Sequence, residues 1–170
     1  MAKDDATMPS VIIFTDGACK GNQFDSATGG YGAVVQTTTG HIELAQGYSD
    51  TTNNRMELRA CIAALKSLKQ PSQVTLFTDS KYVCDAFRQD WIGGWLKRDW
   101  KNASKKPVAN RDLWEELIPL TKVHTVTWEW IKGHVGNEGN ERADTLACMA
   151  AEGRLMVDQG ETVVTIANQG

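Results

Sequence analysis

The chain has 170 residues, of which 41% are hydrophobic and 23% are charged, so one core of ordinary size is expected. This composition excludes collagen-like, fibrous and wholly disordered proteins, and no apolar stretch approaches the roughly 18 residues of a membrane span. The start lacks the pattern of a secretory signal, and the four cysteines show no CxxC spacing. We therefore expect a cytoplasmic protein with a single domain over residues 1–152, without disulfides or a zinc site.

The net charge of −3 is distributed unevenly along the chain. Residues 1–90 carry a net charge of −2 and residues 112–170 carry −6, whereas residues 91–111 carry +5. A compact basic segment suits the phosphates of a nucleic acid, and an acidic excess can contain carboxylates that bind metal ions. We call residues 91–111 the basic insert.

The first predicted elements are three strands at 11–16, 31–38 and 41–48, the last two separated by a turn. Apolar residues then recur at helical spacing from 54 to 68, and the short apolar run 74–79 predicts a buried strand. Three antiparallel strands followed by parallel crossovers indicate an α/β fold, in which helices flank a mixed sheet.

The second half of the chain is predicted to be mostly helical. The expected elements are helices at 80–87, 91–101, 111–121 and 140–152, and a strand at 126–132. The C-terminal tail 153–170 contains only a short strand-like run at 163–166. We therefore expect this tail to be loosely held.

One tripeptide occurs at the ends of two predicted strands, as Phe14-Thr15-Asp16 and Phe77-Thr78-Asp79. If these strands are parallel neighbours, a spacing of about 4.8 Å brings the two carboxylates to one edge of the sheet, where open α/β sheets bind ligands. Glu57 falls on the apolar stripe of the helix 54–68, where a lone charge is costly without a partner. A metal ion would be such a partner.

Each of these acids also has a purely structural interpretation. Asp16 precedes a glycine, as in a turn, and Asp79 could cap the helix that follows it. Glu57 is close to the position of a capping-box glutamate, and Asp144 lies in an early helical turn where the helix dipole favours an anion. The residues alone leave both interpretations open.

His134 lies in a loop between Gly133 and Gly136, after a predicted strand and before Asp144. A histidine in a loop is commonly a solvated surface residue. Mobility between glycines also suits a group that must approach and leave a reacting phosphate while transferring a proton.

Aromatic and basic side chains are interleaved in the basic insert. They are Trp91, Trp95, Lys97, Arg98, Trp100 and Lys101. The tryptophans could form a helical core stripe, since Trp91 and Trp95 fall on one helical face. The same composition in the most positive segment also suits a groove that binds nucleic acid.

Seven motifs, in order, connect this chain to one family. They are FTDGACKGN, GGYGAV, TTNNRMEL, FTDSKYV, WIGGWLKRDWK, KPVANRDLW and WEWIKGHVGNEGNERADTLA. Over about residues 11–151 the chain resembles bacterial type 1 ribonuclease H. The resemblance implies a ribonuclease H-like α/β fold with a five-stranded mixed sheet flanked by helices.

The resemblance also implies an endonuclease that hydrolyses the RNA strand of RNA/DNA hybrids by two-metal-ion catalysis and leaves 3′-hydroxyl and 5′-phosphate ends. The expected cofactor is magnesium, two ions per site, with manganese as a substitute. The expected partner is the hybrid duplex. The protein is expected to be a monomer and not to bind a membrane. The implied metal ligands are Asp16, Glu57, Asp79 and Asp144, with Asp16 bridging both ions, and the implied mobile catalytic histidine is His134.

Two regions carry the implied substrate contacts. Polar contacts to the hybrid backbone and minor groove fall on Asn22, Thr52, Asn53, Asn54 and Arg55. Contacts to the DNA strand fall on the basic insert, which matches the family's basic protrusion, at Trp91, Trp95, Lys97, Arg98, Trp100 and Lys101. The chain departs from the family pattern at a longer loop, 21–30, and at Lys81, where an amide side chain is frequent.

Two other classes of protein stay open. One is a catalytically silent module that binds hybrids, and the complete carboxylate set argues against it. The other is a DNA-directed relative such as an integrase or resolvase, which shares the fold and an acidic site. The motifs WIGGWLKRDWK and TTNNRMEL favour a ribonuclease over this second class.

Overall fold

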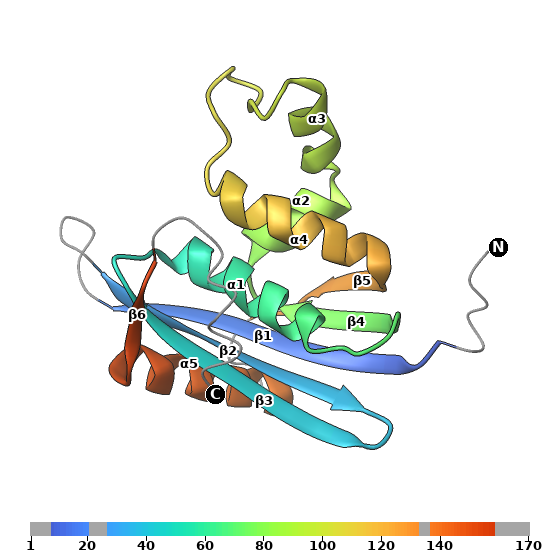
Figure 1. Cartoon of the computed structure of the whole chain (residues 1–170), viewed down its shortest axis with the longest axis vertical. Helices are drawn as coiled ribbons and strands as arrows, with labels where there is room; N and C mark the ends of the chain where they lie inside the picture. Colours follow the sequence, from blue (N-terminus) through green and yellow to red (C-terminus); the bar gives the residue numbers. More distant parts are fainter. Residues whose placement is uncertain (1–7, 21–26, 133–136, 159–170) are drawn as a thin grey trace.

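The computed structural model describes residues 8–20, 27–132 and 137–158. The predicted order of three strands, a helix, a strand, three helices, a strand and a helix is confirmed, and one short strand follows it (Figure 1). The elements are β1 (Ser10–Lys20), β2 (Thr28–Thr37), β3 (Gly40–Ser49), α1 (Asn53–Lys66), β4 (Gln73–Thr78), α2 (Lys81–Arg88), α3 (Trp91–Lys97), α4 (Arg111–Val123), β5 (Thr125–Trp130), α5 (Glu138–Glu152) and β6 (Leu155–Val157).

A single mixed sheet runs through the molecule, with the strand order β5-β4-β1-β2-β3-β6. β1, β2 and β3 pair antiparallel, whereas β4 is parallel to β1 and β5 is parallel to β4. The predicted α/β fold is therefore confirmed. The sheet has six strands rather than the expected five, because β6 pairs in parallel with the edge strand β3.

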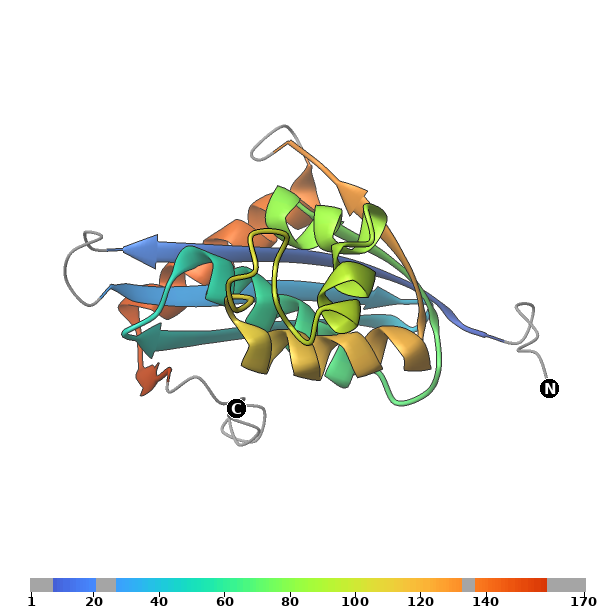
Figure 2. The same ribbon diagram turned by 90° about the horizontal axis from the view of Figure 1, so that it is seen from above.

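Helices cover both faces of this sheet. α5 lies on one face, whereas α1 to α4 lie on the other, and the view from above shows them in front of the strands (Figures 1 and 2). The largest cluster of buried side chains lies on the α1 face and includes Ile13, Leu58, Leu76, Val83 and Trp114. Phe14 of β1 is buried on the other face in a smaller cluster with Ala143 of α5, so this central strand carries apolar side chains toward both faces of the sheet.

The basic insert projects from the α1 face, farthest from α5 (Figure 1). Its helix is shorter than the predicted 91–101, since α3 ends at Lys97. Asp99 and Trp100 have left-handed backbone conformations, with φ of 56° and 61°, and a right-handed helix cannot continue through them. A bridge between Lys101 and Pro107 then closes the remainder of the insert into a loop.

Residues 153–158 are anchored, which differs from the expectation of a loosely held tail. β6 pairs with β3, and the buried carboxylate of Asp158 accepts hydrogen bonds from Arg55 and Arg59. A three-residue strand and one acid give no periodic signal, so the sequence contains little to predict this attachment. The remaining tail, with the strand-like run at 163–166, lies outside the described residues.

The four cysteines are free thiols, and Cys61 and Cys84 are buried as small core residues. Within the described ranges, no helix combines the length and the apolar character needed to cross a membrane.

Candidate active site

Asp16 and Asp79 are brought together by two parallel strands at the centre of the sheet. β1 and β4 pair with Phe14 opposite Phe77 and Thr15 opposite Thr78, so the predicted parallel adjacency of the repeated tripeptides is confirmed. The residue that follows each threonine is an aspartate, Asp16 after Thr15 and Asp79 after Thr78. Asp79 is not the helix cap, because the Oγ of Ser80 accepts the N–H of Val83 at 3.2 Å.

Glu57 reaches these aspartates from α1. Thr52 is the N-cap of α1 and accepts the N–H of Arg55 at 3.2 Å, so Glu57 lies in the second turn and has no capping role. α1 approaches β1 closely at Gly17, where a Cβ atom would lie 2.8 Å from the backbone nitrogen of Glu57. The carboxylates of Asp16, Glu57 and Asp79 offer oxygens that all lie within 4.8 Å of one another.

Asp144 arrives from the opposite face, on α5. This helix packs close to the sheet because Gly30, Gly32 and Gly47 face it, and a Cβ atom on Gly32 would overlap the carbonyl oxygen of Ala143. The second and third glycines of the motif GGYGAV, Gly30 and Gly32, therefore form a packing surface for α5, a role that sequence reasoning missed. Close packing brings the Asp144 carboxyl within hydrogen-bonding reach of Asp16.

The electrostatics of the cluster reflect this crowding. Burial, a hydrogen bond that protonated Asp16 donates to Asp144, and the charges of Asp79 and Asp144 raise the pKa of Asp16 to about 9. Burial, and then the charges of Asp16 and Asp79, also hold the pKa of Glu57 well above its usual range. Among the described residues the buried Oε1 of Glu57 has no hydrogen-bond partner. Crowded carboxylates with an unsatisfied oxygen are hard donors that fit a divalent cation.

The four carboxylates line an open pocket of about 350 Å³. The other lining residues are Gly17, Asn53, Asn54, Ser80, Lys81 and Tyr82. Among the described residues that line the pocket, Lys81 is the single cation, and its Nζ lies 5.2 Å from the centre of the Trp130 ring. The indole N–H of Trp130 donates to the carbonyl of Asp79 at 3.1 Å, so Trp130 connects Lys81 to the acidic cluster.

The predicted substrate contacts divide into three groups. Asn53 and Asn54 are exposed at the pocket. Thr52 caps α1, and Arg55 is bound to Asp112 and Asp158 outside the pocket lining. Asn22 lies outside the described residues, as does His134, the predicted catalytic histidine, so both roles stay predictions.

The tryptophans of the basic insert have different environments. Trp95 is buried and packs edge-on against Trp114 with ring centroids 5.1 Å apart, whereas Trp91 is 37% exposed. Trp100 is half-buried, with the guanidinium of Arg111 5.1 Å from its ring centre. The basic side chains are all exposed, at Lys97, Arg98 and Lys101. The insert therefore combines an aromatic anchor in the core with an exposed cationic surface.

Comparison with known proteins bears directly on this site. The RNase H family model matches residues 8–152, which include all four carboxylates. The chain belongs to the RNase H family. The resemblance to type 1 ribonuclease H is thereby confirmed, and membership disfavours the integrase and resolvase class.

Individual relatives match over most of the chain. The curated ribonuclease H of Erythrobacter litoralis is 54% identical over 145 residues, covering 85% of this chain and 98% of that protein. The ribonuclease H of Cupriavidus pinatubonensis is 52% identical over 140 residues, covering 82% and 94%. The crystal structure of LC9-RNase H1, described as a type 1 RNase H with the type 2 active-site motif, superposes with a TM-score of 0.80 at 32% identity, covering 93% of this chain and 78% of that one.

Proposed function

We propose that this chain is a magnesium-dependent endonuclease that hydrolyses the RNA strand of RNA/DNA hybrids and leaves 3′-hydroxyl and 5′-phosphate ends. The observation that carries the proposal is the cluster of Asp16, Glu57 and Asp79, whose oxygens lie within 4.8 Å of one another in a chain of the RNase H family. Family membership supports the reaction class, and the cluster supports the chemistry that this reaction requires.

Divalent ions held by these carboxylates would supply an activated water and stabilise the leaving oxygen. Asp16 would be the central ligand, because its carboxyl lies within 4.8 Å of those of Glu57 and Asp79 and within hydrogen-bonding reach of Asp144. The donors are hard oxygens, which favours magnesium and accommodates manganese. His134 is proposed to transfer a proton or assist product release, as the family resemblance implies.

The pocket would bind the RNA strand of the hybrid, and the basic insert would bind the DNA strand. Asn53 and Asn54 expose amides that can both donate to and accept from a 2′-hydroxyl, which distinguishes RNA from DNA. The exposed cations of the basic insert are proposed to contact phosphates of the DNA strand, with Trp91 beside them. Phosphate contacts carry no sequence information, so cleavage should be nearly independent of sequence.

We propose further that the protein acts as a cytoplasmic monomer. Four free thiols are typical of a reducing compartment. In the part of the chain that the structure describes, the exposed large apolar side chains come from separate elements, among them Ile12, Ile42, Val123 and Met149.

The test is a cleavage assay on a duplex whose one strand carries a short ribonucleotide stretch within DNA. We expect cuts inside that stretch with magnesium and none with a chelator. The Asp16→Asn variant should keep its circular dichroism spectrum and lose at least about nine-tenths of the turnover, a loss of roughly 1.4 kcal/mol or more. The matched control is Asp50→Asn, the same change at an exposed residue.

Two results would contradict the proposal. Binding of the hybrid without cleavage in magnesium would indicate a silent binding module. Cleavage of duplex DNA in preference to the hybrid would indicate a DNA-directed enzyme.

A further inference from the structure

We infer that Lys81, held against the ring of Trp130, makes the acidic pocket bind divalent ions more tightly when the hybrid is present than when it is absent. The positive charge of Lys81 opposes a cation in the free protein and attracts a phosphate of the RNA strand. The inference rests on the proposed function and goes beyond it, because it assigns the coupling between metal and substrate to one side chain.

The backbone fixes Lys81 beside the acidic cluster through two hydrogen bonds. The N–H of Ser80 donates to the hydroxyl of Thr78 at 3.0 Å. The hydroxyl of Ser80 accepts the N–H of Val83 at 3.2 Å, so α2 begins at Lys81. Lys81 therefore lies two residues after the predicted metal ligand Asp79, and it lines the pocket together with all four carboxylates.

The ring of Trp130 holds the ammonium of Lys81 near the carboxylates without an ion pair. Trp130 lies opposite Thr78 in the pairing of β5 with β4, and its indole N–H donates to the carbonyl of Asp79 at 3.1 Å. The Nζ of Lys81 lies 5.2 Å from the centre of this ring, within the range of a cation–π interaction. Within the described part of the chain, Lys81 forms no ion pair. Its three N–H donors are therefore available to a ligand.

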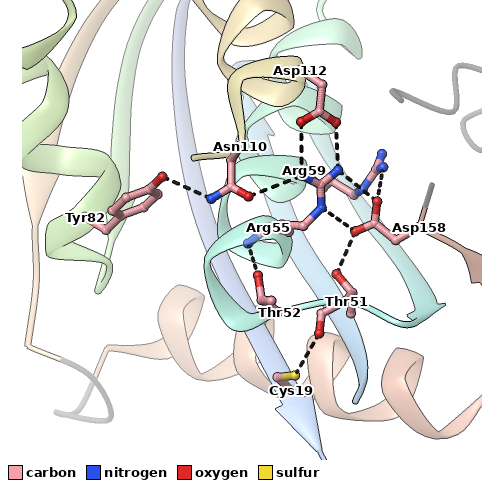
Figure 3. A network of polar contacts seen from close by, with 9 residues as sticks. All are labelled: Cys19, Thr51, Thr52, Arg55, Arg59, Tyr82, Asn110, Asp112 and Asp158. Atoms are coloured by element: carbon pink, nitrogen blue, oxygen red, sulfur yellow. Dashed lines mark hydrogen bonds and ion pairs between the residues drawn. The ribbon is translucent and has the colours of Figure 1, made fainter. Parts of the chain in front are cut away.

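Arg55 shows the contrasting case, a cation whose charge is already offset (Figure 3). Two of its hydrogen bonds go to Asp112, two go to Asp158 and one goes to Asn110. Arg55 also lies outside the pocket lining. Among the described residues that line the pocket, the positive charge that a bound ligand meets is thus that of Lys81.

This charge should weaken the binding of divalent ions to the free protein. The four carboxylates attract such ions, and in the described structure the buried Oε1 of Glu57 has no hydrogen-bond partner. Lys81 opposes this attraction, because like charges that line one small pocket lie closer together than the distance over which salt screens them. The free protein therefore binds magnesium more weakly than its carboxylates alone would.

The same charge should strengthen the binding of the hybrid. A lysine ammonium is a compact point charge with three donors, which suits a phosphate oxygen. The RNA strand is proposed to bind at the pocket, so one of its phosphates can contact Lys81. This contact offsets the charge of Lys81 and so removes its repulsion of the divalent ions. By linkage, each ligand then strengthens the binding of the other by the same factor.

The first test is Lys81→Gln, which removes the charge and keeps most of the side chain. Calorimetry on the protein without hybrid should show the Kd for magnesium fall about three- to tenfold. The Kd of the hybrid, measured with a chelator so that nothing is cut, should rise about two- to fivefold. A structural defect would weaken the binding of both ligands, so the opposite signs identify the effect of the charge.

Two control variants separate the position of the charge from its presence. Lys81→Arg keeps the charge, so both Kd values should stay within about twofold of those of the wild type. Lys122→Gln makes the same change at an exposed lysine of α4 outside the pocket lining, and it should leave both Kd values unchanged. Thermal melts report the stability of all the proteins.

The coupling itself is measured from the magnesium dependence of cleavage. At saturating hybrid a phosphate offsets the charge of Lys81. The half-saturating magnesium concentration of Lys81→Gln should therefore lie within about twofold of that of the wild type, although the Kd values of the two free proteins differ more.

The inference is overturned if Lys81→Gln does not move the two Kd values in opposite directions, or if Lys122→Gln reproduces its pattern. A shift of the half-saturating magnesium concentration as large as the shift in Kd would also overturn it. A wild-type protein that binds the hybrid without cutting it would contradict the proposed function instead, and the two Kd values would still decide the inference.

Discussion

Phe14 on β1 and Phe77 on β4 stack with ring centroids 5.1 Å apart and ring planes within 14° of each other. Alternate residues of a strand share a face, so Asp16 and Asp79 follow these rings on the same side of the sheet. Gly139 of α5 packs against the ring of Phe14, which brings α5, and with it Asp144, over the same face. The stacked rings of Phe14 and Phe77 therefore pack next to the acidic cluster, on the face of the sheet that α5 covers.

Without metal, the acidic cluster should make the stability of the protein fall as pH rises. The pKa of Asp16 is 3.8 ordinarily and about 9 in the folded protein, so between these values the folded state binds more protons than the unfolded state. The stability that Asp16 contributes is fully present below pH 3.8 and is lost as pH rises through about 9. Thermal melts with a chelator across this range test the prediction.

Asp16→Asn and magnesium should each oppose this loss, because each relieves repulsion among the carboxylates. We expect both to raise the Tm at neutral or higher pH, with little gain from Asp50→Asn, which changes an exposed acid. If neither raises the Tm, the four carboxylates do not repel one another as their spacing requires.

Gly32→Ala should destabilise the protein and lower its activity together. The added methyl group overlaps the carbonyl of Ala143, so α5 must move away from the sheet and take Asp144 with it. Overpacking of this kind costs about 1–3 kcal/mol, measured by chemical denaturation. Gly94→Ala is the control, since its Cβ meets only the flexible end of Arg98. Equal stability of the two variants would show that α5 does not need its close approach.

Replacing Lys97, Arg98 and Lys101 together by Ala should weaken hybrid binding more than it slows turnover. These exposed cations carry much of the positive charge of the basic insert. The slope of log affinity against log salt should flatten by up to about two to three units, near 0.7 to 0.9 for each lost phosphate contact. KM and kcat over a salt series provide the measurement.

The control for this experiment removes three exposed cations elsewhere, Lys69, Lys122 and Arg154, and so makes the same change in net charge. Its salt slope should stay near that of the wild type. An equal flattening in both triple variants would assign the effect to overall charge and not to the basic insert.

Trp95 and Trp91 should separate stability from substrate contact. Trp95→Ala removes a buried ring that packs on Trp114 and should cost about 3–5 kcal/mol. Trp91→Ala removes a partly exposed ring and should cost about 1 kcal/mol or less while raising the KM for the hybrid. Chemical denaturation and hybrid-cleavage kinetics on both variants test this prediction. A similar loss of stability in the two variants would contradict the assignment of Trp95 to the core and Trp91 to the substrate.

The features that the sequence predicts are those with a local pattern. The repeated Phe-Thr-Asp tripeptide predicts the pairing of β1 with β4, and the helical spacing of apolar residues predicts α1 with Glu57 on its buried stripe. Trp91 and Trp95 share this helical spacing, yet only Trp95 is buried, because the seven-residue α3 projects from the core.

Other features depend on contacts that no local pattern records. The role of Gly32 is visible only when α5, more than one hundred residues later, lies on it. The attachment of Asp158 to Arg55 spans 103 residues. Such contacts form only in the folded sheet, so the sequence alone predicts a loosely held tail.

The bonds of Asp158 also set an order of events during synthesis. Thr51, Arg55 and Arg59 emerge from the ribosome roughly one hundred residues before the carboxylate that joins them. Until it arrives, a nascent chain would bury the charge of Arg59 without this partner, and long-range contacts of this kind form late. The contacts that hold the first turn of α1 are therefore complete only after residue 158 has been synthesised, so a growing chain that ends before this residue has not yet formed them.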